Sequence, residues 1–465
     1  MQLNWMKAAT LAIAATTGVP LAASAQAPSY NISDAGGQPA LEVEPGDVLA
    51  PAGYSYANTN TNAYAYSAGS AAGAGASCQP CVEQEAVCEP WRLFCQKDCG
   101  INVYGWVSGG IMGNSQSPAS SFNGPVTFPD RDYGQLNQAY AIAEKTIDTG
   151  GCGWDWGGRV DFLYGTDYIF TQATGLELDD DGSSRWNGNP NYGLALPQAY
   201  AEVGYNNLSA KLGHFYTPIG YEVVPATGNF FYSHAYTMQY GEPFTHTGGI
   251  ANWKAADDLT LVAAFVNGWD AFDRVSDSGM GIAGFNYAAS DNLSIAYNYG
   301  YSANESTLDG RQTPRHISSL VVSYNRGDWS YVFQNDVGWQ QEGIDDGSGS
   351  ADPFSSAEWY GVNQYLFYTI NDCWKAGVRA EWFRDDDGVR VGGIRPGQTI
   401  PASGFAGNFY ELTAGMNWTP HANITVRPEV RYDWYDGESA GGIQPFDDGS
   451  RTDQLLYGVD LIVLW

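Results

Sequence analysis

The residues best suited to act on a dissolved solute are charged side chains that recur at every second position in three stretches of the chain. These stretches are residues 154–164, 373–384 and 423–435. Successive side chains of an extended strand point to opposite faces, so each stretch would form a strand with one charged face and one apolar face. A charged face of this kind can attract, repel or guide ions and polar solutes.

These charged faces supply most of the candidate pore-lining residues, and a strand between the last two stretches adds one glutamate. The candidates are Arg159, Asp161, Lys375, Arg379, Glu381, Glu411, Arg427, Glu429, Arg431 and Asp433. On the opposite faces aromatic residues flank short aliphatic ones, which is typical of aromatic girdles around a lipid band. A Lys or Arg facing lipid at the midplane costs about 2–4 kcal/mol, so the charged face should line the interior of a barrel. Alternatively, these charges pair with one another across strands.

The rest of the chain repeats one pattern. A stretch of alternating polar and apolar residues is followed by a tight turn, a second such stretch and a long polar loop. The pattern predicts an all-β fold, a transmembrane antiparallel β-barrel of about 16 strands with short periplasmic turns and long outer loops. The predicted strands are 102–112, 135–147, 154–164, 194–206, 208–216, 244–255, 258–268, 279–289, 292–302, 314–325, 328–339, 356–370, 373–384, 406–418, 423–435 and 452–465. An even number of strands places both ends of the barrel on the periplasmic side.

The last stretch, residues 451–465, alternates in the same way and ends on Trp465. This ending resembles the closing strand of bacterial outer-membrane barrels, whose terminal aromatic residue is recognised by the barrel-insertion machinery. We therefore expect that machinery to be a partner through Trp465. The alternative for this stretch alone is an edge strand of a soluble sandwich.

The N-terminal quarter of the chain predicts export. Residues 1–25 combine Lys7, an apolar run and Ala-Ser-Ala before Gln26, as in a secretory signal peptide, although a short membrane anchor is the alternative. Residues 26–77 are rich in Ala, Gly, Asn and Tyr, which predicts a flexible linker or a segment that adheres to another surface. Residues 78–100 are predicted to be a Cys-rich periplasmic segment with a short helix after Pro90. The barrel would then occupy 101–465.

In an exported chain, cysteines are expected to form disulfides rather than to remain free thiols. Five of the seven lie within residues 78–99, and Cys152 and Cys373 lie in or beside short turns on the same predicted side of the barrel. This topology suggests a bond between Cys99 and Cys152. The Cys78-x-x-Cys81 spacing alone is a weak sign of a metal or redox site, and no histidine lies nearby.

A net charge of −30 argues against nucleic acid as a partner, because phosphate contacts need a basic surface. Runs of aspartate lie in the predicted outer loops, at 179–181, 345–346, 385–387 and 447–448. Their ordinary role is solvation of the loop tips, and the sharper alternative is Ca²⁺ bridging, since paired carboxylates suit that ion. Otherwise we expect no cofactor and no metal.

The third long loop, residues 217–243, is too apolar and aromatic for a solvated tip. In the sixteen-stranded porins that this pattern resembles, the third loop folds inward and narrows the barrel. The candidate constriction residues are Glu222, Phe230, Phe231, Tyr232, Tyr236 and Glu242. The alternative is an outward loop that makes subunit contacts.

Several longer motifs carry a family resemblance. They include LNQAYAIAEK at 136–145, LPQAYAEVGY at 196–205 and the run KLGHFYTPIGYEVVPATGNFFYSHAYTMQYGEPFTHTGG at 211–249. From Cys99 to Trp465 the chain resembles the β-barrel porin-2 (OmpL-like) family. The resemblance implies an outer-membrane porin, and it supplies no substrate.

The sequence therefore predicts an outer-membrane porin for passive diffusion of small hydrophilic solutes and ions. The acidic loops should concentrate cations, which predicts a mild cation preference. The alternatives are a structural or adhesive barrel and a channel specific for one nutrient. We expect no enzyme, because no G-x-S-x-G or H-E-x-x-H motif occurs and the spacing of His214, His234 and His246 matches no metal motif. Membrane lipid would surround the barrel, and a homotrimer is expected by analogy with other sixteen-stranded porins.

Overall fold

The computed structural model describes residues 91–97, 100–126, 133–189, 191–273, 279–307, 310–345, 354–392 and 404–465. The predicted signal peptide and linker, and most of the Cys-rich segment, lie outside these ranges. Within them, no helix is both long enough and apolar enough to cross a membrane.

One antiparallel sheet dominates the described residues, and three short helical segments lie between its strands. The strands are β1 (Asn102–Asn114), β2 (Gln135–Lys145), β3 (Trp154–Gly165), β4 (Gly193–Ala195), β5 (Ala199–Tyr205), β6 (Leu208–Tyr216), β7 (Thr245–Ala256), β8 (Leu259–Val266), β9 (Met280–Ser290), β10 (Leu293–Ser306), β11 (Gln312–Arg326), β12 (Trp329–Asp345), β13 (Phe354–Asn371), β14 (Trp374–Asp385), β15 (Gly407–His421), β16 (Ile424–Gly437) and β17 (Asp453–Leu464). The helical segments are η1 (Thr166–Thr171), η2 (Ala226–Gly228) and η3 (Thr237–Gly241).

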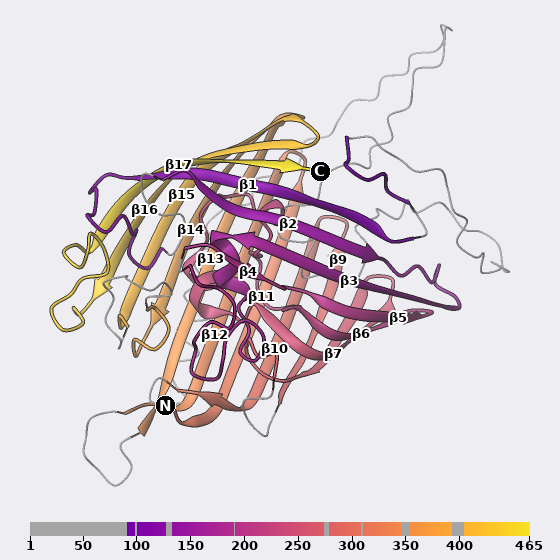
Figure 1. The fold of residues 1–465 in the computed structure, drawn as a ribbon, viewed down its shortest axis with the longest axis horizontal. Coiled ribbons are helices and arrows are strands. Elements are labelled where there is room, and N and C mark those ends of the chain that lie inside the picture. Colours follow the sequence, from indigo (N-terminus) through magenta and orange to yellow (C-terminus); the bar gives the residue numbers. More distant parts are fainter. Residues whose placement is uncertain are drawn as a thin grey trace, which may run out of the picture. The chain divides into compact units, whose positions relative to one another are not determined.

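The sheet closes on itself, as Figure 1 shows for β1 beside β17. Trp106 lies opposite Leu464, and the backbones of Gly105 and Trp465 exchange two hydrogen bonds of 3.2 and 3.0 Å. Both β4 and β5 pair with β3, so they are two parts of one barrel strand interrupted at residues 196–198. The result is a closed antiparallel barrel of sixteen strands, which confirms the predicted fold class.

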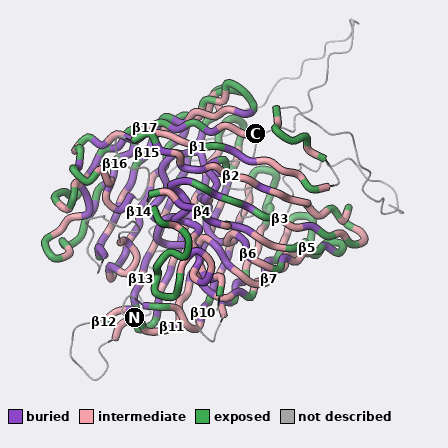
Figure 2. The backbone as a smooth tube through the Cα atoms, in the orientation of Figure 1, coloured by how far each residue is buried: buried purple, intermediate pink, exposed green. Residues whose placement is uncertain are grey.

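The two faces of the barrel wall have the polarity expected for a membrane. Buried residues alternate with more exposed ones along the strands in Figure 2. On β3 the side chain of Phe162 is 49% exposed, whereas its neighbour Asp161 is fully buried. A soluble protein buries the phenylalanine and exposes the aspartate, so this inverted pattern fits a barrel whose exterior faces lipid.

Aromatic residues mark both ends of the exterior. Near the short turns Trp374 of β14 stacks on Trp418 of β15 with ring centroids 5.7 Å apart. Towards the other end of the same sheet Tyr410 stacks on Trp434 at 5.1 Å. Tyr and Trp are enriched at the two membrane–water interfaces, so these pairs delimit the lipid-facing band.

Placing a charge in this band tests the orientation of the wall. Leu412 lies mid-strand on β15, 48% exposed and opposite Ala380. We expect Leu412→Arg to lower the free energy of unfolding by about 2–4 kcal/mol, because a lipid-facing arginine is poorly solvated. Urea unfolding in lipid vesicles measures this, with Leu412→Ala as the apolar control. Equal stability of the two variants would contradict a lipid-facing Leu412.

The third loop lies inside the barrel, as predicted, and the alternative of an outward loop is wrong. It leaves β6 at Tyr216 and returns to β7 at Thr245, two residues that pair with each other. Nearly all of residues 217–243 are buried, including the segments η2 and η3. Its many aromatic and small apolar residues can be buried there only by packing against the interior wall.

The short helix predicted after Pro90 is not formed in residues 91–97. Side chains of the barrel bind this backbone instead. Asn102 bonds both the N–H and the carbonyl of Lys97, at 2.7 and 2.8 Å, and Asn423 donates to the carbonyl of Trp91 at 2.6 Å. These bonds take the place of the i→i−4 bonds that a helical turn would need.

Candidate functional site

Two glutamates of the wall hold the third loop by its backbone. Glu381 of β14 accepts hydrogen bonds from the N–H groups of Tyr236 and Thr237 at 2.6 Å each, and from the Thr237 hydroxyl at 2.7 Å. Glu429 of β16 accepts from the N–H groups of Tyr232 and Ser233 at 2.8 and 3.1 Å. Bonds from backbone N–H to a carboxylate are stronger than neutral ones, so each glutamate fixes one bend of the loop.

Three arginines of the same strands bind carbonyl groups of the loop. Arg379 donates to the carbonyl of Ser233 at 2.8 Å, and Arg431 to that of His234 at 2.6 Å. Arg427 donates to the carbonyls of Ala226 and Asn229 at 3.0 and 2.8 Å. We call Arg379, Glu381, Arg427, Glu429 and Arg431 the pinning residues. They satisfy donors and acceptors of an irregular backbone that is shut off from bulk water.

The pinning residues belong to a buried ionic network. The Arg379 guanidinium lies 2.6 Å from Glu222 of the loop and 2.6 Å from Glu411 of β15. Arg431 lies 2.8 Å from Asp433 and 3.6 Å from Glu411, and both arginines have no exposed side-chain surface. A buried ion pair loses far more than a surface pair when one partner is removed, because the remaining charge stays desolvated.

Glu222 is the loop's own contribution to this network. Burial alone would raise the pKa of its carboxyl, but Arg379 and then His234 lower it to about 2 from the ordinary 4.5. A carboxyl whose pKa is lower in the folded than in the unfolded protein stabilises the fold fully at any pH above its unfolded-state pKa. This stabilisation is lost as the pH falls towards its folded-state pKa. The Glu222–Arg379 contact therefore stabilises the docked loop fully above about pH 4.5 and loses this effect towards about pH 2.

Glycines in the wall make room for the aromatic part of the loop. A Cβ atom on Gly377 would lie 2.5 Å from the Phe230 ring, and one on Gly361 would lie 2.4 Å from the Thr237 hydroxyl. Phe230 packs against Phe367 of β13 with centroids 4.8 Å apart. Side chains at either glycine would displace the loop, so these two positions shape the interior to fit it.

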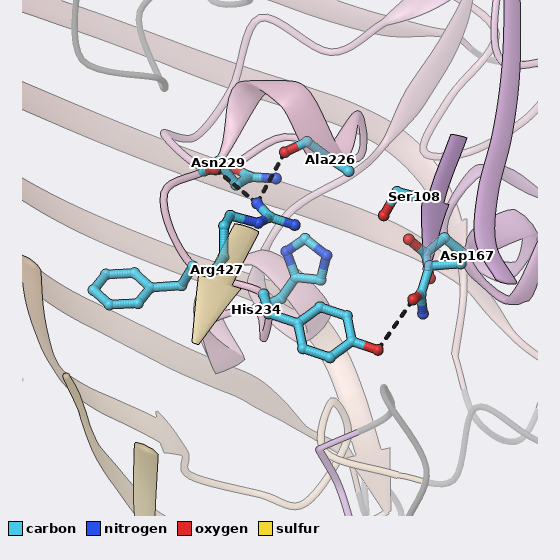
Figure 3. Close-up of a pocket in the computed structure, with 9 residues that line it drawn as sticks. Ser108, Asp167, Ala226, Asn229, His234 and Arg427 are labelled. Atoms are coloured by element: carbon cyan, nitrogen blue, oxygen red, sulfur yellow. Dashed lines mark hydrogen bonds between the residues drawn. The ribbon is translucent and has the colours of Figure 1, made fainter. Parts of the chain in front are cut away.

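A small cavity remains between the loop and the wall. Figure 3 shows Arg427 reaching the backbone of Ala226 and Asn229, with His234 beside it and Ser108 and Asp167 facing them. The residues that line this cavity are Ser108, Asn137, Asp167, Ala226, Asn229, Phe231, Tyr232, His234 and Arg427. Its lining mixes charged, polar and aromatic groups, which suits a single water molecule better than an apolar ligand.

The family model described as "Putative beta-barrel porin-2, OmpL-like" matches residues 100–465. The chain belongs to this family of porins. A search of curated protein sequences found no match. Among solved structures, the outer membrane channel DcaP of Acinetobacter baumannii is similar with a TM-score of 0.50 and 15% identity, covering 78% of this chain and 97% of DcaP. At that identity the likeness shows the fold alone.

Two other solved barrels are similar at lower scores. OmpT, an outer-membrane protein of Vibrio cholerae, has a TM-score of 0.47 and 11% identity over 78% of this chain and 97% of its own. An anion-selective porin from Comamonas acidovorans has a TM-score of 0.47 and 10% identity over 79% of this chain and 99% of its own.

The predicted pore-lining residues of this porin all lie on the interior face, but in different surroundings. Eight of the ten belong to β14, β15 and β16, and Lys375 is the member of that group nearest the short turns. Arg159 and Asp161 lie on β3, where they pair at 2.7 Å, and Arg159 also lies 3.0 Å from Glu144. The four candidate arginines each pair with a carboxylate, so they do not form an uncompensated basic row.

The predicted constriction residues are all buried within the docked loop. Phe230 and Phe231 pack on β13, while Tyr232 donates its hydroxyl to Asn137 at 3.0 Å and Tyr236 donates to Asp433 at 2.9 Å. Glu242 accepts a hydrogen bond from Gln334 of β12. Burial first, and then the neighbouring carboxylate of Asp336, raise the pKa of Glu242 well above its ordinary range.

Sequence reasoning missed several partners in this porin. Asp460 of β17 binds Arg427 at 2.6 Å, and Gln138 of β2 donates to the carbonyl of Val224 at 2.7 Å. Asp460 alternates with the apolar residues of its strand, so its interior position could have been found by the same reasoning that found Arg427. No sequence signal links Gln138 to a loop 86 residues away.

The cysteine and metal predictions are only partly covered by the described residues. Cys95 and Cys152 are disulfide-bonded, and Cys373 is free and exposed. Cys99 lies outside the described residues, so the Cys99–Cys152 bond stays a prediction. In the part of the porin that the structure describes, no three His, Cys, Asp or Glu side chains are placed together to hold a metal ion.

The acidic outer loops use several of their carboxylates internally. Asp179 pairs with Arg185 at 2.6 Å. Asp385 accepts backbone N–H bonds from residues 389, 390 and 391 at 2.7–3.1 Å, and Asp448 bonds the N–H of Ser120 at 3.0 Å. These carboxylates order their loops, as Asp side chains commonly do in turns.

Proposed function

We propose that this protein is an outer-membrane porin through which small hydrophilic solutes and ions diffuse passively, with the docked third loop as the constriction. The observation that carries this function is the loop itself, which is bound to the interior wall by the pinning residues on β14 and β16. The family is one of porins, and the barrel fold is shared with a solved outer membrane channel. A loop bound this firmly narrows the lumen by a constant amount.

Interior charge supports a mild cation preference. Among the described residues, the buried set holds thirteen Asp and Glu side chains and only five Lys and Arg side chains. The whole chain carries a net charge of −30, and several acidic loops lie at the outer end. An excess of acid around a passage concentrates cations and repels anions.

Reconstitution into a planar bilayer tests this function. Purified protein that shows a folded β-sheet spectrum should give discrete channels in KCl. With a tenfold salt gradient, the reversal potential should have the sign of a K⁺-selective pore, and the selectivity should weaken at high salt because the charges are screened. A folded protein without channels would contradict passive diffusion. A reversal potential of the opposite sign would contradict only the cation preference.

One observation favours a second candidate, a structural barrel with a closed lumen. Arg379 and Arg431 have no exposed side-chain surface, so these two pore-lining candidates do not face an open passage. A closed barrel predicts no channels in the intact protein and channels once residues 217–243 are removed. The expected homotrimer and the recognition of Trp465 by the insertion machinery stay predictions.

A further inference from the structure

A second cluster of charged and aromatic residues lies outside the constriction, towards the outer loops. Arg390 follows β14 in the loop and donates from its Nε to the carbonyl of Tyr240, at the end of the third loop, at 2.7 Å. Its guanidinium carbon lies 5.1 Å from the ring centroid of Trp269 and 5.0 Å from that of Trp359. These two indole rings meet edge to face at 6.2 Å. The guanidinium is therefore held in place by a carbonyl and two aromatic rings.

The two terminal Nη groups of this guanidinium make no hydrogen bond with the described residues. Among the described residues, neither Nη atom of Arg390 donates a hydrogen bond and no carboxylate forms a salt bridge with it. The Arg390 side chain is only partly buried. In contrast, every pinning arginine donates at least one Nη hydrogen bond to the backbone of the third loop. An oriented guanidinium with two unused N–H pairs fits a planar oxyanion in a bidentate manner.

A second arginine adds positive charge beside it. Arg315 of β11 lies 5.1 Å from the same Trp269 ring, and its Nε and Nη2 are used by Gln340 at 3.1 and 2.9 Å. Burial first, and then Arg315, lower the pKa of Arg390 to about 10. Asp385, Asp270 and Glu305 oppose this shift, and Asp270 and Glu305 also act on Arg315, so the two arginines already share acidic neighbours. An anion bound at the Nη atoms of Arg390 would reduce the remaining repulsion between the two cations.

Neighbouring acids limit how much negative charge the cluster accepts. Glu305 lies 3.6 Å from Arg315, and Asp270 and Asp385 also act on Arg390 electrostatically. Asp270 and Asp385 already accept backbone N–H bonds, and burial raises the pKa of Asp270 to about 7. A singly charged oxyanion would be attracted by the fork, whereas a doubly charged one would be repelled by three nearby acids.

We propose that Arg390, with Trp269, Trp359 and Arg315, forms a binding site for small monocarboxylate solutes at the outer side of the constriction. The inference rests on the proposed function, because the site would hold a solute that is about to pass the third loop. It also refines that function, since a carboxylate site lets a porin with an acidic interior admit an anion together with its counter-cation.

Binding is measured with fluoroacetate as the probe, by ¹⁹F NMR line broadening on the full-length protein folded in detergent. Wild-type protein should broaden the signal, and Arg390→Gln should weaken the affinity at least tenfold. Arg390→Lys keeps the charge but loses the fork, so it should bind with intermediate affinity. Arg384→Gln is the matched control, since Arg384 lies six positions earlier and pairs with Asp386 and Asn408.

Competition identifies the ligand chemistry. Acetate should displace fluoroacetate at lower concentrations than inorganic phosphate does at pH 8, where phosphate is mostly doubly charged. Unchanged broadening in Arg390→Gln, or phosphate as the better competitor, would overturn the proposal. Each variant is also recorded in a planar bilayer. Channels without fluoroacetate binding would refute the site alone, whereas binding without channels would refute the diffusion function alone.

Discussion

Replacing the third loop by a short turn should increase the single-channel conductance several-fold. Tyr216 and Thr245 pair directly on neighbouring strands, so a Gly-Ser-Gly-Ser turn can join β6 to β7 in place of residues 217–243. The deletion removes every loop group that the pinning residues bind and opens the interior of a sixteen-stranded barrel to water. Planar-bilayer recording of the refolded variant measures the change.

A matched deletion separates this effect from loop shortening in general. Residues 179–183 form an exposed acidic turn of another outer loop, bounded by the bond from the Asp179 N–H to the Ser183 carbonyl. Removing them should leave the unit conductance within experimental scatter. If the deletion of 217–243 gave the same conductance as the wild type, the third loop would not limit the passage.

Arg379→Met should lower the free energy of unfolding by about 3–5 kcal/mol, the range for breaking a buried ion pair. The substitution keeps most of the side-chain volume, but it leaves Glu222 and Glu411 buried without the cation that lies 2.6 Å from each. It also removes the hydrogen bond that Arg379 donates to the carbonyl of Ser233. Urea unfolding in lipid vesicles, followed by tryptophan fluorescence, gives the change.

Arg326→Met is the control, because Arg326 ends β11 at a short turn and is exposed. Surface substitutions of this kind change stability by about 0.5 kcal/mol or less. A loss below about 1 kcal/mol for Arg379→Met would mean that the network is solvated, as surface ion pairs are. The pore would then be wider at Arg379 than the structure shows.

Local alternation predicted the strands of this barrel well, since period-two patterns depend only on neighbouring residues. The predicted strand 208–216 matches β6, and most other predicted ends differ by one to three residues. The predicted strand 194–206 is instead two strands, because Pro197 has no N–H to donate and breaks the pairing with β3. The predicted strand 328–339 continues to Asp345, and the predicted strand 356–370 begins earlier, at Phe354. The added ends pair with each other as a hairpin, after a shift in register.

The candidate site was less predictable, because its contacts are not local. Alternation placed Arg379 and Glu381 on the interior face, but nothing in the sequence indicates that Glu381 binds residues 144 and 145 positions away. Arg390 lies in a loop whose sequence has no alternating pattern. The two tryptophans beside it, Trp269 and Trp359, come from a different loop and from a strand. Composition predicted that the third loop is buried, whereas the partners that bury it depend on the closed barrel.

The position of the pinning residues in the chain sets an order of events during assembly. The third loop is made early, yet its partners Arg379, Glu381, Arg427, Glu429 and Arg431 belong to strands near the C-terminus. Closing such long chain segments costs entropy and slows the formation of contacts. The constriction can therefore be completed only after β14 and β16 have joined the barrel wall, because its anchors belong to those strands.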